Sequence, residues 1–123
     1  DLTNSKFGTL GEGKNQMIYF ANFKNADLTN VDLYGAQFFG CNFDNAQLNG
    51  ITAKYMSILK SDFNNTKINN FKIEQSWIQA TSFNNVQMTN GIFYDVRFID
   101  TYFPETNLDG TKFIGNIEGL SEK

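Results

Sequence analysis

Every fifth residue of this chain is apolar from Phe23 to Phe113, without a gap. A spacing of five fits neither an α-helix nor a β-strand, whose side chains return to one face after about 3.6 and 2 residues. The period therefore comes from a backbone unit that repeats along the chain, and a chain of such units folds as a solenoid. We call the apolar residue of each unit its centre.

Two more positions of each unit have a recognisable composition. The residue two before the centre is mostly small or apolar, whereas the residue just before the centre is usually polar. The two residues after the centre are rich in Asn and Gly, which tolerate the positive φ that tight turns require. We therefore expect two inward side chains per unit, with a turn after each centre.

Residues 21–25, 26–30 and 46–50 read ANFKN, ADLTN and AQLNG. This spelling resembles the pentapeptide repeat family, whose units read roughly Ala-Asp/Asn-Leu-X-X, and the resemblance covers at least residues 21–115. It implies an all-β fold, a right-handed β-helix of square cross-section. Four repeats then make one coil of twenty residues, and the centres stack as ladders inside.

Residues twenty apart support such a coil independently of the resemblance. The four faces of the coil are defined by their centres, which are Phe23, Phe43, Phe63, Phe83 and Phe103 (first face), Leu28, Leu48, Ile68, Met88 and Leu108 (second face), Leu33, Ala53, Ile73, Phe93 and Phe113 (third face), and Phe38, Ile58, Ile78 and Phe98 (fourth face). The column of identical Phe residues predicts offset ring stacking along the axis.

The third face indicates compensation of side-chain volume between layers. Ala53 follows the large Ile51, and Phe93 follows Gly91. Phe71, the bulkiest residue at its inward position, lies between the coils of Ile51 and Gly91. Such exchanges are expected because a close-packed interior needs a roughly constant volume in every layer.

The chain is expected to be one domain over residues 1–123, with about five to six coils. Residues 21–115 form the regular repeats, and residues 116–123 form a C-terminal cap in which Ile117 and Leu120 could cover Phe113.

Residues 1–20 are irregular, and we interpret them as a first coil shifted by one residue. Its centres would be Leu2, Phe7, Glu12 and Met17, and a one-residue insertion within residues 18–20 would restore the register. The alternative is a cap without repeats over residues 1–20.

Composition excludes several classes of function. The net charge is −3, which argues against a nucleic-acid-binding surface and falls short of the dense negative charge of a DNA mimic. The chain has no histidine, and Cys41, its single cysteine, lies at an inward position. These facts argue against an intramolecular disulfide, a metal site and nucleophilic catalysis. We therefore expect no enzyme activity, cofactor, metal or small-molecule substrate.

No run of about 18 apolar residues indicates a membrane span. The first residues, DLTN, lack the basic and apolar regions of a signal peptide. This favours a cytoplasmic protein, although an exported or lumenal location stays open for a processed chain.

The outward positions divide the surface into two halves. On the first face, Asn25, Asn45, Asn65 and Asn85 follow each other in one column, which predicts turn chemistry and an Asn ladder. A flat polar face that binds ice or glycans is the alternative.

The third and fourth faces carry larger apolar side chains outside. We predict a protein-binding surface there, formed by Tyr34, Phe39, Tyr55, Leu59, Trp77, Ile92, Tyr94 and Ile99. The alternative is that these side chains fold over the corners and stay partly buried.

The leading functional hypothesis is a non-catalytic binding or scaffold module, with a protein partner or a second copy of the chain as ligand. The family resemblance implies an alternative, because some pentapeptide repeat proteins protect DNA gyrase from quinolones or toxins by mimicking duplex DNA. Those proteins are expected to be strongly acidic dimers, often with projecting loops, and residues 21–115 contain no insertion. An exported or lumenal structural protein is a third possibility.

Overall fold

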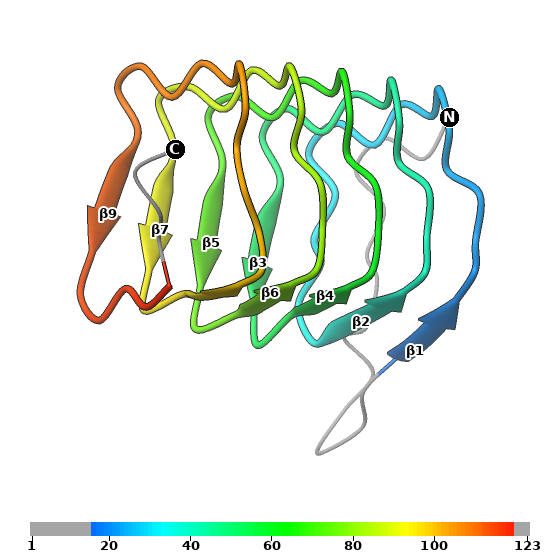
Figure 1. Cartoon of the computed structure of the whole chain (residues 1–123), viewed down its shortest axis with the longest axis horizontal. Helices are drawn as coiled ribbons and strands as arrows, with labels where there is room; N and C mark the ends of the chain where they lie inside the picture. The colour runs from blue at the N-terminus through cyan, green and yellow to red at the C-terminus, as the bar shows by residue number, and fades with distance from the viewer. Residues whose placement is uncertain (1–15, 120–123) are drawn as a thin grey trace.

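The protein is a solenoid of short parallel β-strands (Figure 1). The structure is a computed structural model and describes residues 16–119. Its strands are β1 (Gln16–Tyr19), β2 (Ala36–Phe39), β3 (Thr52–Lys54), β4 (Ser57–Leu59), β5 (Lys72–Glu74), β6 (Trp77–Gln79), β7 (Ile92–Tyr94), β8 (Arg97–Ile99) and β9 (Lys112–Ile114). No helix occurs among residues 16–119, so the predicted all-β solenoid is confirmed.

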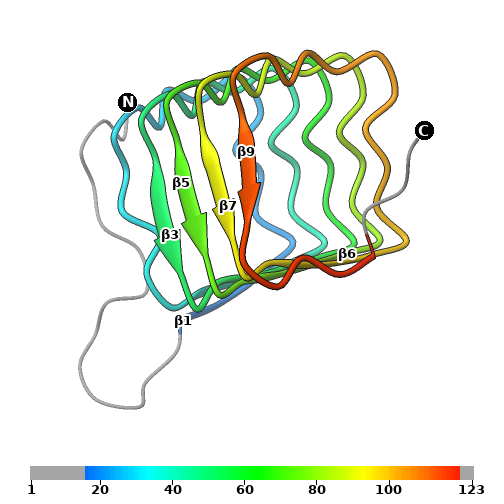
Figure 2. The same cartoon turned by 90° about the vertical axis from the view of Figure 1, so that its left-hand side faces the viewer.

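The strands form two sheets, which are the third and fourth faces. The five-stranded sheet has the order β1-β2-β4-β6-β8, and the four-stranded sheet, seen in Figure 2, has the order β3-β5-β7-β9. The first and second faces are joined by isolated parallel bridges, such as Asn42 with Asp62 and Gln47 with Lys67. All these pairs are twenty residues apart, which confirms four units per coil.

The predicted register shift of the first coil is wrong where the structure describes it. Ile18 pairs with Phe38, twenty residues later, and Met17 pairs with Gln37. Met17 is therefore an outward residue, half exposed, and no residue is inserted within residues 18–20. The regular register thus begins by residue 16. The other predicted centres of that coil, Leu2, Phe7 and Glu12, lie outside the described residues.

One backbone conformation recurs in every unit. Every fifth residue from Phe20 to Gly115 has a φ between 46° and 77°, the left-handed region. Most of these residues are Asn, Gly or Asp, which tolerate this region, but Tyr55 and Ala80 also adopt it. The turn positions predicted from Asn and Gly are therefore confirmed, and the fold imposes the same turn on residues that do not favour it.

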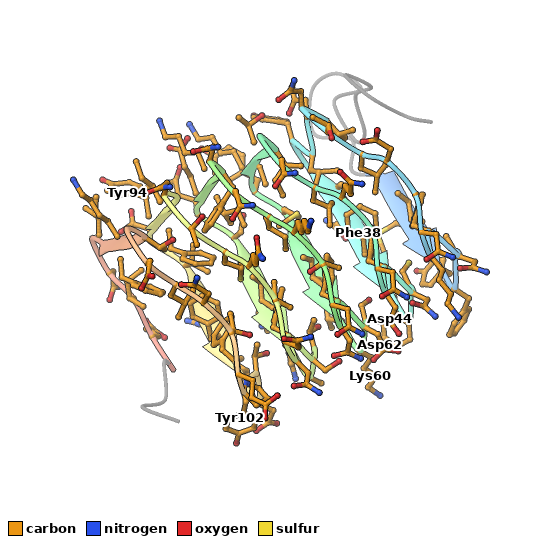
Figure 3. The ribbon with its side chains drawn as sticks, turned by 90° about the horizontal axis from the view of Figure 1, so that it is seen from above. Phe38, Asp44, Lys60, Asp62, Tyr94 and Tyr102 are labelled. Atoms are coloured by element: carbon orange, nitrogen blue, oxygen red, sulfur yellow. The ribbon has the colours of Figure 1, made fainter. Side chains whose placement is uncertain are left out.

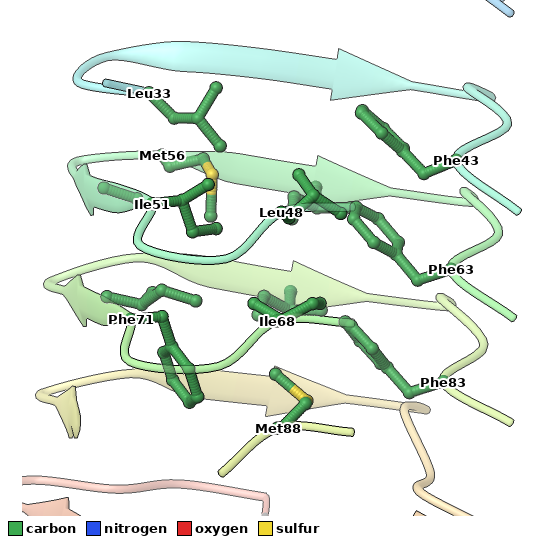
Figure 4. Close-up of a cluster of buried hydrophobic side chains, with 14 of the residues drawn as sticks. Leu33, Phe43, Leu48, Ile51, Met56, Phe63, Ile68, Phe71, Phe83 and Met88 are labelled. Atoms are coloured by element: carbon green, nitrogen blue, oxygen red, sulfur yellow. The ribbon is translucent and has the colours of Figure 1, made fainter. Parts of the chain in front are cut away.

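Stacked aromatic rings fill the first face of the core, as predicted. The ring centroids of Phe43 and Phe63 are 4.4 Å apart with an interplanar angle of 15°, and those of Phe63 and Phe83 are 5.1 Å apart. Figure 4 shows these rings in line with the axis, beside the Leu48, Ile68 and Met88 column. A void in this core measures only about 10 Å³, about the size that one water molecule needs.

The volume compensation on the third face is also confirmed. Phe71 is buried, and its ring occupies the space where a Cβ of Gly91 would stand. Its ring also contacts Phe93, with centroids 5.0 Å apart. A side chain at residue 91 would therefore collide with the Phe71 ring unless that buried ring shifted.

The last described residues leave the twenty-residue register. The Asn116 N–H donates to Asp95 Oδ1 (2.7 Å), and the backbone of Glu118 forms a parallel β-bridge with that of Arg97. The residues of each pair are twenty-one apart in the sequence. Ile117 packs against the core, while Leu120 lies outside the described residues, so the cap over residues 116–123 stays a prediction.

We predict that Gly91→Ala destabilises the protein by about 1–3 kcal/mol, because the added methyl group collides with the Phe71 ring. Thermal or urea unfolding measures this change. Combining Gly91→Ala with Phe71→Leu should recover part of the loss. Strictly additive effects of the two substitutions would contradict a direct contact.

We predict that Ala80→Asn stabilises the protein by about 0.5–1 kcal/mol. Ala80 is exposed with a φ of 53°, a conformation that costs Ala more than Asn. The control is Thr52→Asn at an exposed strand position outside the left-handed region, which should not stabilise the protein. Equal unfolding midpoints for Ala80→Asn and the unsubstituted chain would disprove the prediction.

Candidate functional site

The predicted binding residues lie outside two neighbouring sheets. Tyr34, Tyr55, Ile92 and Tyr94 are on the third face, and Phe39, Leu59, Trp77 and Ile99 are on the fourth. The three tyrosines and Trp77 are between 40% and 48% exposed, whereas the four other side chains are only partly exposed. Tyr34, Tyr55, Trp77 and Tyr94 therefore reach solvent, whereas Phe39, Leu59, Ile92 and Ile99 are partly buried, as the alternative expected. The binding of a protein at this surface stays a prediction.

Charged side chains interrupt the aromatic residues on the third face. The rings of Tyr34 and Tyr55 meet edge to face at 5.6 Å, and Lys54 Nζ lies 5.2 Å from the Tyr55 ring centroid. Lys72 and Glu74 form an ion pair of 3.5 Å. Tyr94 lies beyond this pair, so the third face presents separate aromatic sites among charges rather than one continuous apolar patch.

On the fourth face, Trp77 is held between coils by Arg97. The guanidinium carbon of Arg97 lies 5.6 Å from the Trp77 ring centroid, and its Nε donates to Glu118 Oε1 at 3.1 Å. Arg97 and Glu118 are both about half exposed, so the ion pair itself contributes little stability. Its effect is to hold a planar cation against the indole, which is 41% exposed.

The sequence prediction missed a second aromatic group. Tyr19 is 58% exposed and Phe20 is 72% exposed. Their rings lie 6.1 Å and 5.8 Å from Phe39, over which Lys60 also lies. Extending the twenty-residue period one coil back would have placed Tyr19 before Phe39, but the assumed register shift hid this relation.

The first and second faces are polar, and their side chains hydrogen-bond along the axis. Asn85 Nδ2 donates to Asn65 Oδ1 at 2.9 Å, which confirms a step of the predicted Asn ladder. On the second face, Asn69 donates to Asn49 Oδ1, and the Thr89 hydroxyl donates to Asn69 Oδ1 at 2.6 Å. These side chains thus hydrogen-bond to one another, so the columns of polar residues are accounted for without a ligand.

A shallow open groove of about 370 Å³ runs beside the first face, lined by residues that include Asp62, Ser82, Asp100 and Tyr102. The Ser82 hydroxyl donates to Asp62 Oδ1 at 3.2 Å. In Figure 3, Asp44, Lys60 and Asp62 lie along the same side of the solenoid as Tyr102, so acidic and basic groups alternate there.

Within residues 16–119, no group of three or more Cys, Asp or Glu side chains is arranged to hold a metal ion. No helix long and apolar enough to cross a membrane occurs in the same range. Cys41 is buried, as predicted, with its Sγ 3.4 Å from the carbonyl oxygen of Ile18.

Comparison with known proteins identifies the repeat. The family description "Pentapeptide repeats (8 copies)" matches residues 19–52. No curated protein sequence matches the chain.

Solved structures with the fold of this chain include the following two. One is a pentapeptide repeat protein, Rfr23, from the cyanobacterium Cyanothece 51142, with 14% identity and a TM-score of 0.57, covering 94% of this chain and 88% of that one. The other is trypsin-treated QnrB1, a plasmid-mediated fluoroquinolone resistance protein, with 17% identity and a TM-score of 0.58, covering 89% of this chain and 68% of that one. Identities this low establish the fold alone.

Proposed function

Because this chain carries pentapeptide repeats and has the fold of pentapeptide repeat proteins, we propose that it is a non-catalytic module that binds a protein partner. The binding surface is the exterior of the third and fourth faces. The observation that supports it is the group of four aromatic side chains, Tyr34, Tyr55, Trp77 and Tyr94, each 40% to 48% exposed. Exposed aromatic residues supply much of the energy of protein–protein binding.

The rigidity of the solenoid favours this use of the surface. The aromatic residues stand on or beside strands that are hydrogen-bonded to the coils on both sides, such as β6 between β4 and β8. Binding a partner therefore loses little conformational entropy in these residues, because the backbone that carries them is already ordered. Their separation by Lys54, Lys72 and Glu74 means that such a partner needs charged as well as apolar side chains.

Catalysis has no comparable support. The interior void of about 10 Å³ cannot hold a substrate, and the groove beside Asp62 and Asp100 is open to solvent. Asp95 Oδ1 accepts the N–H of Asn116, which gives this carboxylate a structural role.

We expect Trp77→Ala to weaken binding of the partner by about tenfold or more, because it removes a half-exposed indole at the middle of the surface. Capture of the partner on immobilised protein, followed by a titration, measures the loss. Tyr102→Ala is the matched control, because Tyr102 is 53% exposed but lies on the first face. If Trp77→Ala and Tyr94→Ala both bind like the unsubstituted chain, the partner uses another surface.

The family resemblance leaves one alternative, protection of DNA gyrase from quinolones by mimicry of DNA, and QnrB1, a fluoroquinolone resistance protein, shares the fold. The net charge of −3, with carboxylates and lysines interspersed, does not supply the dense negative charge of a duplex. We therefore expect the purified chain at micromolar concentration to leave quinolone inhibition of gyrase supercoiling unchanged. Recovery of supercoiling would establish the alternative and contradict this expectation.

A further inference from the structure

Among residues 16–119, the two edges of the five-stranded sheet differ in what pairs with them. At the β8 edge, the Phe98 N–H donates to the carbonyl oxygen of Glu118 (2.8 Å), and the Glu118 N–H donates to that of Val96 (3.2 Å). Residues near the C-terminal end thus continue the ladder past β8. At the opposite edge, β2 is the one strand that pairs with β1 among residues 16–119. Figure 1 shows β1 at one end of the solenoid, at the limit of the sheet.

The chemistry of β1 suits pairing with another strand. Residues 16–23, QMIYFANF, contain no charged residue and no proline, and most of them are apolar or aromatic. Proteins commonly place charges, especially Lys, on sheet edges to prevent pairing with other chains. The last strand of the four-stranded sheet follows this rule, since β9 carries the exposed Lys112. The β1 segment does not, and short uncharged segments of this kind favour strand pairing.

This edge carries the two most exposed large apolar side chains of the described residues, Tyr19 and Phe20, together with the half-exposed Met17. Met17 is 50% exposed, Tyr19 58% and Phe20 72%. Taking about 200 Å² for each aromatic side chain, Tyr19 and Phe20 offer roughly 260 Å² per copy. A stable complex buries about 800 Å² on each partner, so these two residues supply about a third of a standard interface.

We propose that the β1 edge, with Met17, Tyr19, Phe20 and Phe39, is a self-association surface for a second copy of this chain. The two copies meet across a two-fold axis, so that β1 pairs antiparallel with β1 of the second copy and the two solenoids join by their N-terminal ends. A two-fold axis brings identical segments together, and β1, which carries no charge, meets its copy without electrostatic repulsion. The cation beside this surface, Lys60, lies over Phe39 and two coils away from β1. The small apolar area predicts a weak dimer that depends on concentration.

The test is sedimentation velocity of the full chain over a range of concentrations, with a monomer–dimer equilibrium as the expected result. Phe20→Asn should raise the dimer dissociation constant at least about tenfold, because it removes the most exposed ring. Phe20 has a φ of 55°, which Asn tolerates better, so this variant should fold at least as well. Met17→Lys, which adds a charge to the edge, should weaken the dimer in the same way.

Tyr55→Asn is the matched control, because Tyr55 has a φ of 56° and is 48% exposed, but lies on the third face. It should leave the dissociation constant unchanged. A second readout is cross-linking under mild oxidation, in which Met17→Cys should give a disulfide-linked dimer and Tyr55→Cys should not. The native Cys41 is buried, so it should not form cross-links in either variant.

Three results would overturn the proposal. The first is a monomer at every concentration up to about the millimolar range, where even weak association is visible. The second is a dimer that neither Phe20→Asn nor Met17→Lys weakens. The third is equal weakening by Tyr55→Asn. The proposal does not depend on the proposed function, since a partner that binds at Trp77 and a dimer formed at β1 respond to different substitutions.

Discussion

The hydrogen bonds between successive coils impose a constant coil length of twenty residues, and the other features of this protein depend on that constraint. The Phe43 N–H donates to the carbonyl of Asp62 at 2.7 Å, and the Phe63 N–H donates to that of Ser82 at 2.9 Å. One inserted or deleted residue would turn every later inward side chain outward. Each unit must therefore make the same corner, which is why Tyr55 and Ala80 adopt the left-handed conformation usually taken by Asn or Gly.

A constant register turns the core and the surface into columns. Inside, identical rings stack when the column is uniform, as in the Phe43, Phe63 and Phe83 series, and unequal residues must compensate, as Phe71 and Gly91 do. On the outside, the spatial neighbours of each side chain are the residues twenty positions before and after it in the sequence. Asn49, Asn69 and Thr89 use this to satisfy one another, and a binding residue such as Trp77 acquires Arg97 as its support.

The outward positions of a solenoid determine which partner it can bind. The repeat sets the backbone, so partner choice depends on the outward positions that the repeat leaves free. On the third face those positions mix tyrosines with Lys54, Lys72 and Glu74, and on the fourth face Trp77 lies beside Arg97. At the β1 end, residues 16–23 carry no charge, and Tyr19 and Phe20 are the two most exposed large apolar side chains of the described chain. The two proposals concern these two regions, one a lateral surface and the other an end of the rod.

The five-residue period of the sequence by itself determined the solenoid, because no helix or strand repeats its side chains at that spacing. Columns of residues twenty apart supported the four-unit coil that the family resemblance implies, and they predicted the Phe stack and the exchange of side-chain volume around Phe71 and Gly91. Sequence reasoning failed at Met17, where an assumed insertion replaced the simple continuation of the register to Ile18. Only the tertiary structure decided how exposed each outward residue is. That depends on neighbours in adjacent coils, as with Lys60 over Phe39, and on which ends of the sheets are covered. The pairing of Arg97 with Glu118 could not be predicted from the period, because the two residues are twenty-one apart rather than twenty. The register can change there because no later repeat has to stay aligned.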